Sequence, residues 1–287
     1  MDRLVMTLLV AMLLLSGGRY LIGPLEFEDD AAQAVRTWRT SGAAEIWRHG
    51  FVPLGDLSAM SPEVRKQIEH DDEEYGWVVA GPLPAPPAGA QIRWDDGSTM
   101  RVPVIEPREA LMALSPWPEE YTFPDDKTHK LTGATLTTMR LETVRGLATV
   151  PAWRLHFANL PGPIDHVAVD QDAIGSVEDA VGEHASGEGV TDVKVLDERT
   201  LLVGYDYGSC GGEPPDVRLR VSERPDVVVL GLYVPGLSFG PCAGVGLFGK
   251  DVIRLEQPLG DRVMLDAGSR LPVLCHDAPY GCSSRDG

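Results

Sequence analysis

The second half of the chain alternates apolar and polar residues with a period of two. This alternation is typical of strands that bury one face. Neighbouring runs are joined by hairpin-length turns, for example at residues 197–198 and 225–226. Loops this short cannot hold the crossover helices that a parallel sheet requires. The pattern predicts antiparallel strands over residues 136–141, 147–157, 164–169, 190–196, 201–205, 217–221, 227–234 and 252–255, with one short helix over 173–183.

The first third of the chain has helical spacing instead. Apolar side chains recur three or four residues apart over 31–38, which predicts a helix that ends before Gly42. Ser61 is a good N-cap residue and Pro62 suits the first helical turn, so a second helix is predicted from there to the acidic residues 71–74. The alternating segment 92–104 contains an Asp-Gly turn and predicts a hairpin.

These elements together predict an α+β fold with N-terminal helices and a hairpin, followed by an antiparallel β-rich region. A proline-marked stretch at 115–130 is the best boundary that the sequence offers. The expected organisation is a leader over 1–25, a small α+β domain over 26–114, a linker over 115–130 and a β-rich domain over 131–287.

The leader begins with Asp2 and Arg3, continues with an apolar run over 4–15, and then reaches small residues at 16–18. This order is typical of a signal peptide cleaved after Gly18. Alternatively, residues 4–25 have about the 20-residue span of an uncleaved membrane anchor. A buried N-terminal helix of a cytosolic protein is the third interpretation. The first two predict an extracytoplasmic protein, secreted or tethered to the membrane, whose membrane contact would be confined to residues 4–25.

The composition indicates that the chain can form a hydrophobic core and that it is acidic. The chain has 287 residues, 43% of them hydrophobic, which is enough for one or two domains with a real core. Its formal net charge of −18 repels phosphate backbones, and no run of Lys or Arg is present. The sequence therefore argues against a nucleic-acid partner, and the acidity is best interpreted as a means of solubility.

The four cysteines lie in the last third of the chain, at Cys210, Cys242, Cys275 and Cys282. Four thiols allow three disulfide connectivities. We expect Cys275 to pair with Cys282 across a short turn, and Cys210 with Cys242, which lie in loops at opposite ends of a predicted strand pair. An exported chain meets an oxidising compartment, where such disulfides persist. Four unpaired thiols are the alternative.

A serine nucleophile is the first candidate chemistry. Residues 236–240 match the Gly-x-Ser-x-Gly elbow of α/β-hydrolases around Ser238. His276 follows in the proper order, after Asp251, Asp261 and Asp266, of which we take Asp266 as the acid. However, the elbow needs a helix directly after the serine, and the prolines and glycines that follow deny one. We therefore expect no catalytic site and keep Ser238, Asp266 and His276 as the alternative.

Two other motifs have the wrong surroundings. Residues 208–212 resemble the Cys nucleophile motif of picornaviral chymotrypsin-like cysteine proteases, with His129, His156 or His166 as a possible base, but an exported cysteine is more often structural. Residues 244–249 spell a dinucleotide fingerprint that leads into a strand, and we interpret them as a glycine-rich loop. His156 and His166 could also face each other across a hairpin. No spacing typical of a zinc or calcium site occurs, so neither a metal nor a cofactor is expected.

Several short motifs carry a resemblance. They are Leu-Ser-Gly-Gly at 15–18, Gly-Phe-Val-Pro-Leu at 50–54 after Trp47, Val-Pro-Ala-Trp at 150–153, Pro-Leu-Gly-Asp-Arg at 258–262, and Cys210 with Cys242. In these the chain resembles exported and lipoprotein-like proteins of actinobacteria, a family without an assigned activity. Gly18 stands where a lipoprotein has its lipidated cysteine.

The function predicted from these observations is that of a non-catalytic binding or structural protein of the cell envelope. It would bind an envelope protein or a ligand through its β-rich C-terminal region. The alternative is a secreted serine hydrolase that uses Ser238 and His276.

Overall fold

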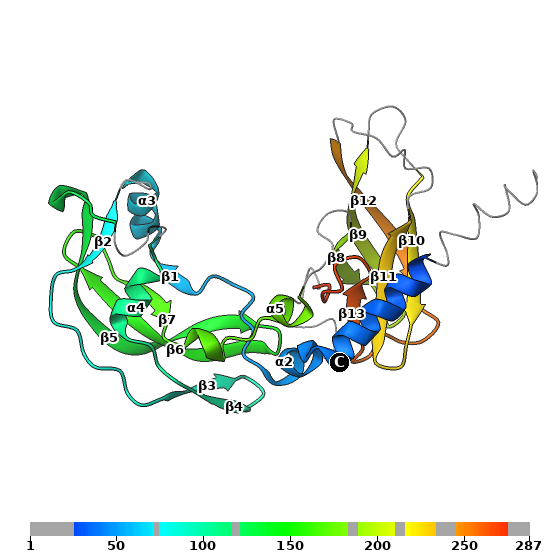
Figure 1. Cartoon of the computed structure of the whole chain (residues 1–287), viewed down its shortest axis with the longest axis horizontal. Coiled ribbons are helices and arrows are strands. Elements are labelled where there is room, and N and C mark those ends of the chain that lie inside the picture. Colours follow the sequence, from blue (N-terminus) through cyan, green and yellow to red (C-terminus); the bar gives the residue numbers. More distant parts are fainter. Residues whose placement is uncertain are drawn as a thin grey trace, which may run out of the picture. The chain divides into compact units, whose positions relative to one another are not determined.

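The computed structural model describes residues 26–71, 75–115, 117, 121–182, 189–209, 216–233 and 245–274. These residues form a mixed α+β fold that divides into two compact units (Figure 1). The inserted unit is Ile46–Gly175. The flanking unit is made of the residues before and after it, up to Glu45 and from Ser176 onward. The first boundary falls within helix α2 (Ala43–His49).

The inserted unit is built on a seven-stranded sheet. Its centre is the long antiparallel pair β5 and β6, and β6 also pairs with β3 and β7 along its other edge. The outer pairings are β4 on β3, β1 on β7, and β2 in parallel on β5. The strands are β1 (Ser58–Met60), β2 (Gly76–Val79), β3 (Ala90–Trp94), β4 (Thr99–Val102), β5 (Thr128–Thr143), β6 (Gly146–Phe157) and β7 (Ile164–Val167).

The chain before β1 partly closes this sheet on itself. The Leu54 amide donates to the carbonyl of Glu142, and the Val144 amide donates to the carbonyl of Val52, at the end of β5. Six residues further on, the same segment pairs with β7 as strand β1. Residues 51–60 therefore contact the two strands that lie on either side of β6, and they bring β1 to its place.

Tryptophans dominate the two apolar clusters of the inserted unit. Trp94 is 2% exposed, and its Nε1 donates to the Thr143 hydroxyl at 3.0 Å. Trp153 is 1% exposed, and its Nε1 donates to the carbonyl of Ile105 at 2.8 Å. Each ring thus buries a large apolar area and still satisfies its polar atom.

Short helices flank the sheet. In α3 (Pro62–Asp71) the Ser61 hydroxyl accepts from the Val64 amide, which is the capping contact expected of that serine. In α4 (Pro107–Met112) Glu106 and Glu109 form a reciprocal capping box. The 3-10 turns η2 (Asp125–Lys127) and η3 (Gln171–Ala173) complete the unit.

The flanking unit packs two three-stranded sheets face to face. One contains β10 (Arg218–Glu223), β11 (Val227–Tyr233) and β13 (Val263–Asp266); the other contains β8 (Gly189–Val195), β9 (Thr200–Ser209) and β12 (Val245–Arg254). The buried cluster between them draws Val203 from β9, Val228 and Leu230 from β11, and Met264 from β13. A short helix, α5 (Val177–Val181), precedes the first of these strands.

The helix over residues 26–40 covers the outer face of β11. The side chains of Val227 and Val229 are buried under this helix. The alternate residues Val228 and Leu230 point to the opposite face of the strand, towards the other sheet. At Gly231 an added Cβ would lie 2.9 Å from the Phe27 ring, which shows how closely the helix approaches. Strand β11 is therefore buried on both faces, and this explains its unbroken apolar sequence.

The motif at 258–262 has a structural role. Arg262 donates to the carbonyls of Gln257, Pro258 and Leu259 and to Glu223 Oε2 at 2.9 Å. Burial opposes ionisation of Glu223, yet the amides of Glu256 and Gln257 and the Arg262 guanidinium together hold its pKa below the ordinary value. The turn is thus held by one charge-assisted network.

The division into units differs from the predicted one. Strand β5 begins at Thr128, inside the predicted linker 115–130, and its ladder with β2 joins both sides of that linker in one sheet. Residues 26–40 pack with the C-terminal strands rather than with the hairpin β3–β4. The predicted domains 26–114 and 131–287 are therefore not the compact units of the structure.

Strand β12 corrects a second expectation. Residues 245–249 were expected in a glycine-rich loop, but they pair with β9. Gly249 makes this possible, because an added Cβ there would lie 2.3 Å from the Tyr205 ring. The aromatic ring occupies the space that the missing side chain leaves.

The predicted leader, residues 1–25, lies outside the described residues. In the part of the chain that is described, no helix is long and apolar enough to cross a membrane.

Candidate functional site

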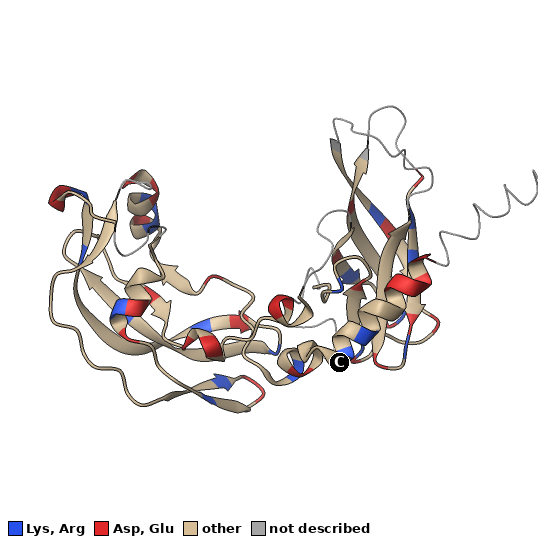
Figure 2. Ribbon diagram, in the orientation of Figure 1, with Lys and Arg blue, Asp and Glu red and all other residues tan. Residues whose placement is uncertain are grey.

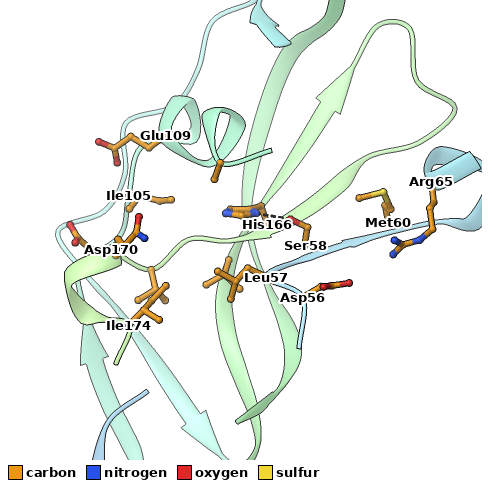
Figure 3. A pocket seen from close by; sticks show the side chains of 14 residues that line it. Asp56, Leu57, Ser58, Met60, Arg65, Ile105, Glu109, His166, Asp170 and Ile174 are labelled. Atoms are coloured by element: carbon orange, nitrogen blue, oxygen red, sulfur yellow. Dashed lines mark hydrogen bonds between the residues drawn. The ribbon is translucent and has the colours of Figure 1, made fainter. Parts of the chain in front are cut away.

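A cavity with a volume of about 870 Å³ lies in the inserted unit (Figure 3). It is walled by the β1 segment, the start of α3, the α4 segment, and the chain that leaves β7. Its lining residues are Asp56, Leu57, Ser58, Met60, Arg65, Ile105, Glu109, Ala113, His166, Val167, Val169, Asp170, Gln171 and Ile174.

Ser58 and His166 form a polar pair in the wall of this cavity. They are directly opposite each other in the antiparallel pair β1–β7, so their side chains leave the same face of the sheet. The Ser58 Oγ and His166 Nδ1 lie 2.7 Å apart. His166 is 6% exposed, which leaves it deep in the wall rather than at the rim.

Burial determines the charge state of His166. Loss of solvent lowers the pKa of this imidazole to about 4. At neutral pH the ring is therefore uncharged and has one donor and one acceptor nitrogen. The pair Ser58–His166 presents fixed hydrogen-bonding groups without a charge.

Charged side chains surround this neutral pair. Glu109 and Asp170 lie on one side of His166 together with Ile105 and Ile174, whereas Arg65 lies on the other side with Asp56 and Met60 (Figure 3). Two of the carboxylates also hold the backbone. Glu109 Oε2 accepts from the Glu106 amide at 3.0 Å, and Asp170 Oδ1 accepts from the Asp172 amide at 2.9 Å.

The pair lacks the features of a nucleophile and its base. A catalytic histidine must carry a positive charge in the transition state and is oriented by an acid. The low pKa of His166 opposes that charge, and among the described residues no carboxylate forms an ion pair with it. Ser58 also sits within a paired strand rather than at a turn before a helix. At neutral pH the arrangement therefore offers a ligand one uncharged pair of hydrogen-bonding groups.

A second, smaller cavity of about 340 Å³ lies near α4 and β2, lined among others by Trp77, Leu111 and Phe123. Its aromatic residues Trp117, Tyr121 and Phe123 pack against one another, with ring centroids 4.9 to 6.1 Å apart. The described part of its lining is mainly apolar and aromatic.

The residues of the hydrolase alternative are only partly described. Ser238 and His276 lie outside the described residues. Asp266 is 5% exposed, and its two oxygens accept from the amides of Val190 and Ser269. This carboxylate therefore joins β8 to the turn after β13 in the flanking unit.

The same holds for the predicted disulfides, because Cys210, Cys242, Cys275 and Cys282 lie outside the described residues. His156 and His166, which the sequence would allow to face each other across a hairpin, do not do so. In the register of β6 and β7, His166 lies opposite Trp153, and His156 pairs with Gly133 of β5. His129 lies apart from both, stacked against Tyr75.

Ser58 was not found from the sequence. It is 108 residues away from His166, and its partner is set by the pairing of β1 with β7. A three-residue strand has too little alternation to reveal such a register.

The charged residues of both units are mixed in sign. Figure 2 shows Lys and Arg interspersed with Asp and Glu along the helices and strands. Within the described residues, no group of three or more His, Cys, Asp and Glu side chains could hold a metal ion. No protein-family model, no curated protein and no solved structure matches this chain.

Proposed function

We propose that this chain is a non-catalytic ligand-binding protein that works outside the cytoplasm, and that the cavity around Ser58 and His166 is its binding site. The observation that carries the proposal is the cavity itself: about 870 Å³ with a half-buried, neutral hydrogen-bonding pair in its wall. Ligand sites combine apolar surface with polar groups that fix the orientation of the ligand, and this lining is half apolar and half polar. The cavity lies in the inserted unit and draws its lining from both sides of the predicted linker 115–130.

Blocking the cavity is expected to abolish ligand binding without unfolding the protein. Ala113 is exposed at the rim, so Ala113→Trp places a large ring over the opening at little cost to the core. A thermal-shift screen of small metabolites should give stabilising compounds for the wild type that no longer act on Ala113→Trp. The matched control is Ala88→Trp, an exposed alanine that does not line the cavity.

Two outcomes would contradict this function. Compounds that stabilise the wild type and Ala113→Trp equally would place binding elsewhere. Covalent labelling by a fluorophosphonate probe would show a nucleophilic serine instead. Loss of that label in Ser238→Ala would support the hydrolase alternative with Asp266 and His276, whereas loss in Ser58→Ala would make the cavity itself catalytic.

The location outside the cytoplasm rests on the leader. The apolar run over 4–15 followed by small residues supports export, and four cysteines in an exported chain support two disulfides. We expect the intact mass of the protein from its native host to lack residues 1–18, and to rise by about 4 Da on reduction. A full-length chain with four free thiols in the cytosol would contradict both parts.

A further inference from the structure

The acidic side of the cavity points to a ligand class. This inference rests on the proposed function and deepens it. The lining contains three carboxylates, Asp56, Glu109 and Asp170, against one guanidinium, Arg65. The chain as a whole has a formal net charge of −18, so its field attracts cations towards such a site.

Charge and apolar surface occur together on one side of His166. Glu109 and Asp170 lie there beside Ile105 and Ile174, while Arg65 lies on the opposite side of Ser58 and His166 (Figure 3). A ligand on the acidic side would therefore meet negative charge and aliphatic side chains at once. It would not meet the guanidinium.

The two carboxylates can accept more hydrogen bonds than they do now. Each uses one oxygen for a backbone amide, Glu109 for Glu106 and Asp170 for Asp172. An ionised carboxylate offers about four lone-pair sites. A protonated amine with its three donors could be shared between them, and charge-assisted hydrogen bonds of this kind are the stronger ones.

The rest of the wall suits an uncharged portion. Leu57, Ile105 and Ile174 provide aliphatic contact, and the half-buried Ser58–His166 pair provides a neutral polar contact beyond it. We propose that the cavity binds an organic amine, with its ammonium group between Glu109 and Asp170 and its apolar body against Ile105 and Ile174.

Three six-carbon probes test this directly on the purified full chain at pH 7.5: hexylammonium, hexan-1-ol and hexanoate. They share one apolar body and differ in the charge of the head group. Isothermal titration calorimetry should show hexylammonium binding at least tenfold more tightly than hexan-1-ol, and hexanoate more weakly than hexan-1-ol.

The double variant Glu109→Gln/Asp170→Asn should weaken hexylammonium binding at least tenfold and leave hexan-1-ol binding unchanged. The amides keep an oxygen for the Glu106 and Asp172 backbone groups, so the local fold is retained. The control Asp126→Asn/Glu142→Gln removes the same charge from exposed positions of the inserted unit outside the cavity lining, and should change hexylammonium binding less than twofold.

The outcomes separate the two proposals. If hexanoate or hexan-1-ol binds as tightly as hexylammonium, and Ala113→Trp removes that binding, the amine proposal is overturned and the binding function stands. If both double variants weaken hexylammonium equally, the effect is one of net charge and the amine proposal is overturned as well. If no probe binds, the amine proposal fails, and the small-metabolite screen decides the binding function.

Discussion

Replacing Trp153 with alanine is expected to lower the free energy of unfolding by about 3–5 kcal/mol, the range found when large buried aromatic residues are truncated. Trp153 is 1% exposed and belongs to the cluster formed with Ala110, Leu111 and Leu155. The variant also loses the hydrogen bond from Nε1 to the Ile105 carbonyl. Urea unfolding followed by far-UV circular dichroism measures the change without depending on tryptophan fluorescence.

Two matched variants make this prediction specific. Trp153→Phe keeps most of the ring and removes the hydrogen bond, so it should cost about 1–2 kcal/mol. Phe248→Ala removes an aromatic side chain that is 83% exposed and should change stability by less than about 0.5 kcal/mol. A cost for Trp153→Ala no larger than that of Phe248→Ala would contradict the packing of the inserted unit.

The second large effect is a loss of stability in mild acid that depends on His166. Its pKa falls from the ordinary 6.5 to about 4 in the folded protein because the imidazole is buried. The folded state therefore binds this proton more weakly than the unfolded chain does. The stability linked to the neutral imidazole is fully present above about pH 6.5. As the pH falls towards 4, the free energy of unfolding decreases by about 3 kcal/mol in total on account of His166.

Comparison with His166→Asn isolates this contribution. Asparagine cannot take up the proton, so the difference in unfolding free energy between wild type and variant should shrink by about 2–3 kcal/mol between pH 7 and pH 4.5. Urea titrations at four pH values measure it, and the other titrating groups cancel in the difference. Parallel pH profiles for the two proteins would show that His166 is solvated in the folded state.

Much of the strand content could be predicted from the alternation of the sequence. The apolar run of β11 and the alternating residues of β6 identify strands because their own side chains are buried in the sheet. Strand β5 was predicted only over 136–141, although it extends from Thr128 to Thr143. Its first residues are held by pairing with β2 and β6, and such pairing leaves little trace in local composition.

The cavity could not be predicted for a related reason. Ser58, Glu109 and His166 come from three segments that are brought together by strand pairing and by the packing of α4. No spacing of residues in the sequence indicates that these three segments lie close together in the fold. The motifs that were visible in the sequence, around Ser238 and Cys210, were local runs rich in glycine, and locality is what made them easy to see.

The insertion of one unit within the other sets the order in which the two units can be completed as the chain emerges N-terminus first. All residues of the inserted unit are contiguous, so it can collapse as soon as about 130 consecutive residues have emerged. The helix over 26–40 emerges earlier, but its hydrogen-bond partners lie far along the chain. Asp226 follows its partner Arg39 by 187 residues, and Ser222 follows its partner Glu28 by 194 residues. Until those strands appear, its apolar face, with Ala31, Ala34 and Trp38, is the part of the nascent chain that a chaperone would have to shield.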